Sequence, residues 1–161
     1  MPDSASSLSH PVLGIEIGGT KLQLGIGRGS GSPLTHFKRL LVDPSQGARR
    51  ILRQIHDCGS ELLQSVPVSA VCAAFGGPVQ ADEGRIRKSN QIDGWADFPL
   101  RDWLQEVFGH PAKVLNDCDA AALAEASFGA GRTPLREYVD QMVFAPLRNS
   151  YHIVPAFLGE E

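Results

Sequence analysis

The pattern of apolar and polar positions predicts a β-hairpin near the start of the chain. An apolar stretch at 12–17 leads into Gly18-Gly19, and apolar residues then recur at every second position from 22 to 26. Because strand side chains alternate with period two, we expect a strand, a tight turn and a second strand. Glycines in such a turn can take positive φ and let another group approach the backbone closely.

The same turn carries candidate chemistry. Thr20 and Lys21 follow the two glycines directly. Successive amide N–H groups, a hydroxyl and an ammonium together indicate a phosphate-binding turn. An ordinary hairpin with a Gly-Gly turn explains the stretch equally simply, so both interpretations stay open at this point.

Beyond the hairpin, the pattern predicts alternating strands and helices. The helix at 47–65 places Ile51, Ile55, Cys58 and Leu62 on one face. We expect Asp43-Pro44 to open this helix and Asp119 to cap the last one. Alternation of this kind favours an α/β fold. The expected elements are a strand at 36–42, the helix at 47–65, a buried strand at 68–75, a loop or edge strand at 85–91, a helix from Asp97 or Pro99 to 108, a strand at 113–116 and a helix at 120–128.

Two polar or glycine-rich pairs fall where predicted strands end. Gly76-Gly77 follows one buried strand, and Asn116-Asp117 follows another. Ligands of α/β proteins collect at the carboxyl ends of strands, so these pairs indicate a site. Asp117 is either a group that acts on a ligand or a second capping acid beside Asp119.

Composition narrows the classes of function. The chain has 161 residues, 42% hydrophobic and 20% charged, with net charge −3. These values are ordinary for a globular protein and give no reason to expect a nucleic-acid or membrane partner. Three cysteines (58, 72 and 118) lie in or beside apolar stretches, so we expect buried free thiols in the cytoplasm. The five histidines have no metal-ligand spacing.

The ordered set of motifs resembles the N-terminal lobe of the ROK family, which includes bacterial glucokinases, other hexose kinases and transcriptional repressors. The resemblance implies an α/β fold of the actin-like ATPase (ribonuclease H-like) type, a mixed sheet with helices on both faces. It runs from Val12 to Gly131. The motifs that carry it are Glu16-Ile17-Gly18-Gly19-Thr20-Lys21, Phe75-Gly76-Gly77-Pro78-Val79, Lys88-Ser89-Asn90, Gly94-Trp95, Asn116-Asp117, Ala120 to Glu125 and Gly129-Ala130-Gly131.

The resemblance also implies residue roles and ligands. Asp117 matches the catalytic base that accepts a proton from the attacked sugar hydroxyl. Asn90, Asn116 and the Gly76-Gly77 backbone would bind the sugar. The ATP phosphates and Mg²⁺ would lie against Glu16, Gly18, Gly19, Thr20 and Lys21.

Two departures from the family pattern bear on activity. Glu16 stands where the family usually has aspartate, and the extra methylene moves a carboxylate that would hold a Mg²⁺-bound water. After Gly131 the second glycine-rich phosphate turn and the cysteine-rich zinc loop are not found, so no zinc site is expected. Residues 132–161 instead look like a remnant of the C-terminal lobe, left by an internal deletion or natural in a small variant.

These observations set the expected organisation and function. We expect a disordered tail at 1–11, a ROK-type lobe at 12–131 and the remnant at 132–161. The expected activity is ATP-dependent phosphoryl transfer to a hexose, weak or absent in this chain alone because one lobe offers half a phosphate clamp. The alternatives are a non-catalytic sugar-binding remnant and a fragment of a sugar-responsive regulator. Self-association through the exposed lobe face is a further expectation.

Overall fold

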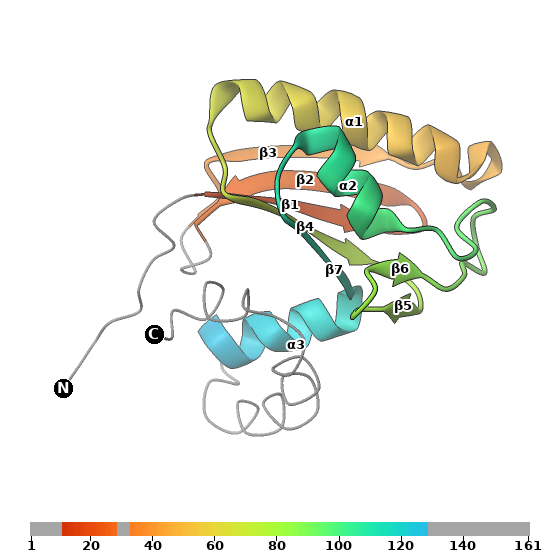
Figure 1. Cartoon of the computed structure of the whole chain (residues 1–161). Coiled ribbons are helices and arrows are strands. Elements are labelled where there is room, and N and C mark those ends of the chain that lie inside the picture. Colours follow the sequence, from red (N-terminus) through yellow and green to blue (C-terminus); the bar gives the residue numbers. More distant parts are fainter. Residues whose placement is uncertain (1–10, 29–32, 129–161) are drawn as a thin grey trace.

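The computed structural model describes residues 11–28 and 33–128, which form a five-stranded sheet with helices and a small hairpin (Figure 1). The strand order in the sheet is β3-β2-β1-β4-β7. The tail predicted at 1–11, apart from Pro11, and the segment at 132–161 lie outside the described residues. The elements are β1 (Val12–Ile17), β2 (Lys21–Gly27), β3 (His36–Leu41), the 3₁₀ turn η1 (Pro44–Gln46), α1 (Gly47–Ser65), β4 (Ala70–Phe75), β5 (Val79–Gln80), β6 (Arg85–Ile86), α2 (Leu100–Phe108), β7 (Ala112–Asn116) and α3 (Asp117–Phe128).

The sheet is mixed. β1 pairs antiparallel with β2, which pairs antiparallel with β3, whereas β1 and β4 run parallel, as do β4 and β7. The predicted hairpin is therefore confirmed, and the later strands are joined by helical crossovers. The parallel arrangement brings the carboxyl ends of β1, β4 and β7 to one edge of the sheet.

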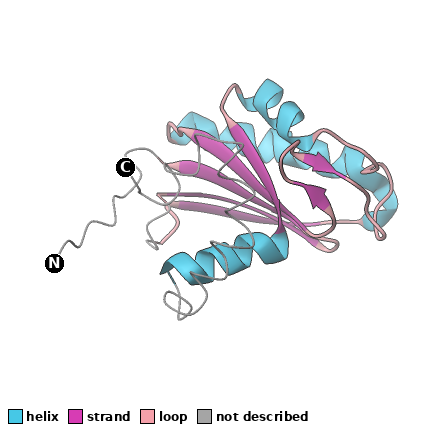
Figure 2. Cartoon of the chain, turned by 60° about the horizontal axis from the view of Figure 1, so that its bottom comes forward, coloured by secondary structure: helices cyan, strands magenta, loops and turns pink. Residues whose placement is uncertain are grey.

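Helices cover both faces of the sheet. Figures 1 and 2 show α1 and α2 on one side and α3 on the other. The core lies mainly under α1 and α2, because the residues of β1, β2 and β4 that face this side are aliphatic or aromatic. Its largest fully buried side chains are Trp95, Leu13, Ile17, Leu22, Leu24, Ile26, Ile51, Ile55, Ile86, Leu100, Leu104 and Val71.

The face that carries α3 has smaller and more polar side chains. Gly14 and Gly25 are paired across β1 and β2, and Phe37 follows in the same row on β3. Phe37 is 55% exposed and Leu41 is 84% exposed. Over β2 and β3, this face of the sheet is therefore less densely covered than the face under α1 and α2.

The helix predicted at 47–65 is confirmed with the same bounds as α1, but its start differs from the prediction. Asp43 caps η1 instead, where its carboxylate accepts from Ser45 N at 3.1 Å and from Ser45 Oγ at 2.6 Å. These hydrogen bonds lower the pKa of Asp43. Gly47, at φ +66°, then separates the 3₁₀ turn from the rest of α1.

The last helix begins three residues earlier than predicted. α3 starts at Asp117 directly after β7, so Asp119 lies inside the first turn and does not precede it. The capping bond comes from Asn116, whose Oδ1 accepts from Cys118 N at 2.9 Å. Strand and helix therefore meet without a loop, and Asp117 is fixed by regular structure on both sides.

The cysteine prediction is partly wrong. All three thiols are free, but only Cys58 is buried, Cys72 is half-buried and Cys118 is exposed. Cys118 occupies the solvent side of the first turn of α3, which the apolar run after it did not indicate. No helix in the described part of the chain is long and apolar enough to cross a membrane.

Candidate active site

The ends of β1 and β4 are held side by side. Gly76 N donates to Ile17 O at 2.9 Å, which continues the parallel ladder by one bond past the strands. A Cβ built on Gly76 would lie 3.7 Å from Gly18 Cα. The first glycine turn and the second, far apart in the sequence, are therefore in contact.

The glycines of the two turns let neighbouring groups come close to the backbone, and none of them adopts an unusual backbone conformation. Gly18, Gly19, Gly76 and Gly77 all lie outside the positive-φ region, so the positive φ that glycine would allow in the first turn is not adopted. A Cβ on Gly77 would lie 2.9 Å from a ring carbon of Phe75. Real Cβ atoms almost never come this near a neighbour, so the turn needs a residue without a side chain.

Asn116 ties the end of β7 to the second glycine turn. Its Nδ2 donates to Gly77 O at 2.8 Å, while its Oδ1 accepts from Cys118 N. One amide thus links β7, α3 and the turn that follows β4. The side chain is half-buried, so these bonds are partly shielded from water.

Asp117 points toward the glycine turns. Its Oδ2 lies 3.5 Å from the Cβ position on Gly76, and its Oδ1 accepts from Cys118 N at 2.9 Å. The residue is exposed, so the carboxylate faces solvent beside Gly76 and Gly18. A carboxylate in the first turn of a helix is also favoured by the helix dipole.

Cys118 reports the charge of this carboxylate. The pKa of the Cys118 thiol is raised, chiefly by the negative charge of Asp117. A thiolate beside a carboxylate is disfavoured because two like charges repel. Cys72 differs: the residue is half-buried, but its thiol is shielded from water, and this desolvation raises its pKa to about 12.

Glu16 and Lys21 form an ion pair at the base of the first turn. Lys21 Nζ lies 3.1 Å from Glu16 Oε1, and Gln23 Nε2 donates to Glu16 Oε2. Both charged side chains are about 40% exposed (40% and 41%). Thr20, which is exposed, completes the turn, and its carbonyl accepts from Val42 N at 3.0 Å.

The loop 88–92 reaches both glycine turns. Lys88 O lies 3.4 Å from the Cβ position on Gly77, and Asn90 is exposed on the same loop. Gln91, which the sequence analysis did not single out, places its Oε1 1.8 Å from the Cβ position on Gly19. No local pattern indicates this contact, because it joins segments that are distant along the chain.

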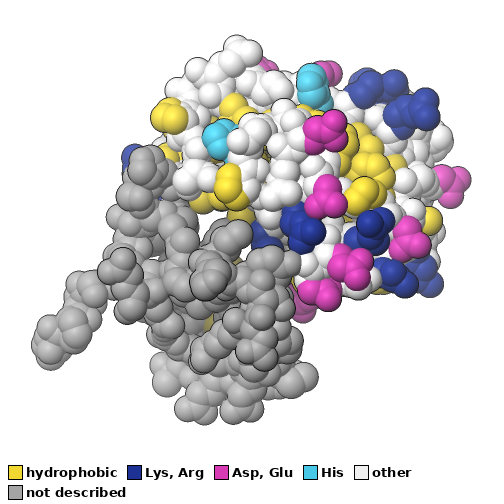
Figure 3. Space-filling view, viewed as in Figure 1, with side chains coloured by type: hydrophobic (Ala, Val, Ile, Leu, Met, Phe, Trp, Pro, Cys, Tyr) yellow, Lys and Arg dark blue, Asp and Glu magenta, His cyan; other side chains and the backbone are white. Residues whose placement is uncertain are grey.

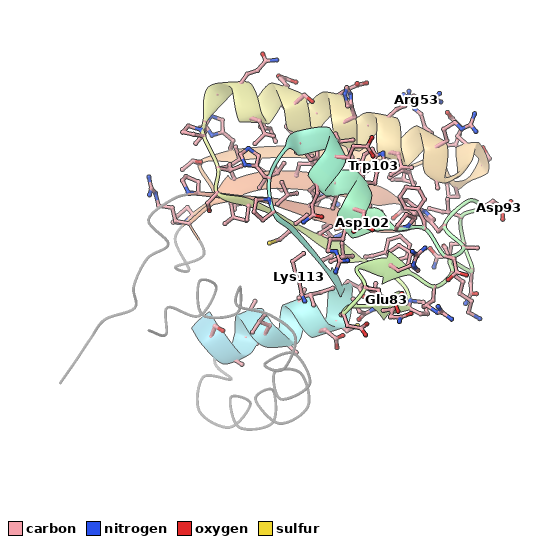
Figure 4. All side chains as sticks on the ribbon, in the orientation of Figure 1. Arg53, Glu83, Asp93, Asp102, Trp103 and Lys113 are labelled. Atoms are coloured by element: carbon pink, nitrogen blue, oxygen red, sulfur yellow. The ribbon has the colours of Figure 1, made fainter. Side chains whose placement is uncertain are left out.

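The loop is anchored in the core by Trp95. This side chain is fully buried and makes edge-on contacts with Phe75 at 5.1 Å and Phe98 at 5.5 Å between ring centroids. Asp93, labelled in Figure 4, lies beside the start of α1, where its carbonyl accepts from Ala48 N at 2.8 Å. Trp95 therefore anchors this part of the chain in the core.

Within the described residues, no three His, Cys, Asp or Glu side chains are grouped closely enough to hold a metal ion. On the face shown in Figure 3, basic side chains gather at the upper right, whereas basic and acidic side chains are interspersed over the lower part of the coloured surface. Two ion pairs of this kind are Arg87–Asp97 and Arg101–Asp102, each at 3.2 Å.

The fold and the meeting of these turns at one sheet edge are those of the actin-like ATPase fold as sugar kinases carry it. The ROK family model matches residues 12–146, and the chain belongs to the ROK family. The glucokinase of Thermotoga maritima is 29% identical over 122 residues, which are 75% of this chain and 38% of that protein.

Two solved structures extend the comparison. A ROK family glucokinase from Streptomyces griseus, in complex with glucose and AMPPNP, matches with TM-score 0.68 and 30% identity over 75% of this chain and 38% of that chain. The inorganic polyphosphate/ATP-glucomannokinase of Arthrobacter sp. strain KM matches with TM-score 0.67 and 29% identity, over 76% of this chain and 50% of that one. The chain spans well under half the length of its first curated relatives, from 24% to 40%.

Proposed function

We propose that this chain carries the hexose-binding half of a ROK-type sugar kinase site, in which Asp117 is the catalytic base. The observation that carries the proposal is the position of Asp117 Oδ2 against the turn of Gly76, beside Gly18. The turn near Gly18 would hold phosphates and the turn at Gly76-Gly77 would hold sugar. The carboxylate therefore lies where donor and acceptor would meet.

The proposed reaction is a direct phosphoryl transfer from ATP. Asp117 accepts the proton of a sugar hydroxyl, and the hydroxyl oxygen forms a bond to the γ-phosphorus as the bond to the ADP oxygen breaks. Asn116, Asn90 and the backbone of Gly76-Gly77 hold the sugar hydroxyls by hydrogen bonds. Most of the catalysis in such transfers is positioning and electrostatic stabilisation, so one well-placed carboxylate suffices as the base.

The phosphate end fits its proposed ligand in part. Gly18 and Gly19 present backbone without side chains, and Thr20 and Lys21 add a hydroxyl and an ammonium. Glu16 is the carboxylate available to Mg²⁺, which proteins usually bind through one or two carboxylates together with substrate phosphates. When bound, Mg²⁺ neutralises charge on the phosphates. In this structure Glu16 is paired with Lys21, so that pairing must loosen for the metal.

We further propose that the 161 residues alone bind sugar better than they turn it over. The described residues that would contact sugar and phosphate follow neighbouring strands of one sheet. If binding also needs groups on the opposite side of the ligands, those contributions are lost together. A non-catalytic sugar-binding remnant is therefore the second candidate.

The test is an assay of ADP release with glucose, N-acetylglucosamine, mannose and fructose. We expect a rate far below the roughly 10 per second of ordinary enzymes. Any residual rate should vanish in Asp117→Asn and persist in Asp119→Asn, the matched control in the same turn. A residual rate that survives Asp117→Asn overturns the assignment of the base.

A further inference from the structure

The Gln91 carboxamide lies directly on the backbone of the first glycine turn. Measured from the Cβ position on Gly19, Oε1 is at 1.8 Å, Cδ at 3.0 Å and Nε2 at 3.7 Å. A methyl group on residue 19 and the Gln91 side chain therefore cannot occupy their places together. Gln91 is exposed, and among the described residues the recorded neighbour of its carboxamide is the backbone of Gly19.

The loop that carries Gln91 is held at several points. Ser89 Oγ accepts from Gln91 N at 3.3 Å and from Ile92 N at 3.2 Å, which folds the loop into a tight turn. Ile92 is 5% exposed and packs into the core. At its other end, Lys88 O approaches Gly77. One short loop therefore contacts the turn after β4 through its backbone and the turn after β1 through a side chain.

We propose that Gln91 is a positioning residue that couples the loop 88–92, which would hold the sugar, to the turn at Gly18-Gly19, which would hold phosphate. This inference rests on the proposed function. A hexose held by Asn90 fixes the loop, and the adjacent Gln91 transmits that position to Gly19. The carboxamide suits this place because it is uncharged and so does not repel an approaching phosphate. It also offers both a donor and an acceptor. The spacing between the sugar hydroxyl and the phosphate turn is then set by the length of one side chain.

The coupling has a direct readout in the full chain. We would titrate ¹⁵N-labelled protein with glucose and follow the backbone amides of Gly19, Gly76 and Gly77 by NMR. In the wild type, all three amides shift with one shared dissociation constant. In Gln91→Ala the Gly19 shift is lost while the shifts of Gly76 and Gly77 remain.

Three further variants separate coupling from general damage. Gly19→Ala breaks the same contact from the opposite side, so the Gly76 and Gly77 shifts stay and the shift of residue 19 disappears. Gln91→Glu keeps the length of the side chain, and in this titration with glucose alone, where no phosphate is present to be repelled, it retains the coupling. Gln64→Ala removes an exposed glutamine of α1 and leaves every shift as in the wild type.

The outcomes distinguish this inference from the proposed function. If glucose shifts Gly76 and Gly77 but the Gly19 response is absent, or survives in Gln91→Ala, the coupling is wrong and the sugar site stands. If neither glucose nor mannose, N-acetylglucosamine or fructose shifts any of these amides in the wild type, the proposed function fails and the inference fails with it.

Discussion

Asn116 Nδ2 donates a 2.8 Å hydrogen bond to the carbonyl of Gly77, which joins the last strand of the sheet to the turn that follows β4. The same side chain accepts from Cys118 N through Oδ1, so it fixes the start of α3 as well. The neighbouring Asp117 is thereby aimed at Gly76. The junction of β7, α3 and the second glycine turn thus depends on this one half-buried amide.

Replacement of Asn116 should therefore affect stability and binding together. We expect Asn116→Ala to lower the free energy of unfolding by about 1–2 kcal/mol, because a helix cap and a partly buried hydrogen bond are lost. Hexose binding should weaken in parallel. Urea unfolding and calorimetry measure the two effects. Asn90→Ala, at an exposed position, should weaken binding with unchanged stability, and equal destabilisation of both variants would contradict this account.

Gly76→Ala separates function from folding. The added methyl would lie 3.4 Å from Ile17 O and 3.5 Å from Asp117 Oδ2, which are ordinary contact distances. We expect the free energy of unfolding to change by no more than about 0.5 kcal/mol. Sugar binding should nevertheless fall, because the methyl stands between the turn and the carboxylate. Gly14→Ala, with 3.7 Å to Gly25 O, is the control, and calorimetry should find its binding intact.

Cys118 provides a test of the charge on Asp117. Because Asp117 is the main cause of the raised pKa of Cys118, Asp117→Asn should lower that pKa. A larger fraction of thiolate forms at pH 8, so alkylation by iodoacetamide should be faster. Asp119→Asn should have a smaller effect, since its charge contributes least. Mass spectrometry of the alkylated peptides gives the rates, and identical rates in the wild type and Asp117→Asn would place the carboxylate elsewhere.

Trp95 should be the main anchor of the loop 88–92. Trp95→Ala removes a fully buried ring packed between Phe75 and Phe98, and we expect a loss of about 3–5 kcal/mol in unfolding free energy. Trp95→Phe should lose less, because Trp95 Nε1 makes no hydrogen bond to the described residues and only ring area is given up. Thermal unfolding measures both, and a Trp95→Ala chain as stable as the wild type would refute the anchor.

The sequence predicted the elements of the fold well because strong periodicity decided them. The alternation before and after Gly18-Gly19 and the apolar stripe of α1 leave few other arrangements. Local capping was less predictable. Asp43 bonds to Ser45 within the preceding 3₁₀ turn, and Asn116, a strand residue, caps α3 in place of Asp119. Both outcomes depend on where the chain turns in space, which neighbouring residue types do not specify.

The sequence predicted which residues lie at the candidate site better than it predicted which of them contact one another. Glycine turns and polar pairs at strand ends are visible in the sequence, and the structure brings Gly18, Gly76 and Asp117 together. The close approach that the first glycine turn allows was predicted, but the neighbours that come close, Gln91 at Gly19 and Phe75 at Gly77, are defined only in the folded chain. No feature of the sequence indicated a role for Gln91. The alanine-rich run beside Cys118 suggested a buried thiol, so its exposure was not predicted.

The most direct test of the central claim is calorimetric titration of the folded 161-residue chain with glucose, mannose, N-acetylglucosamine and fructose. The account predicts saturable binding of at least one hexose with one site per chain, and a marked loss of affinity in Gly76→Ala but not in Gly14→Ala. Absence of binding for all four sugars, or binding that Gly76→Ala leaves unchanged, would contradict it.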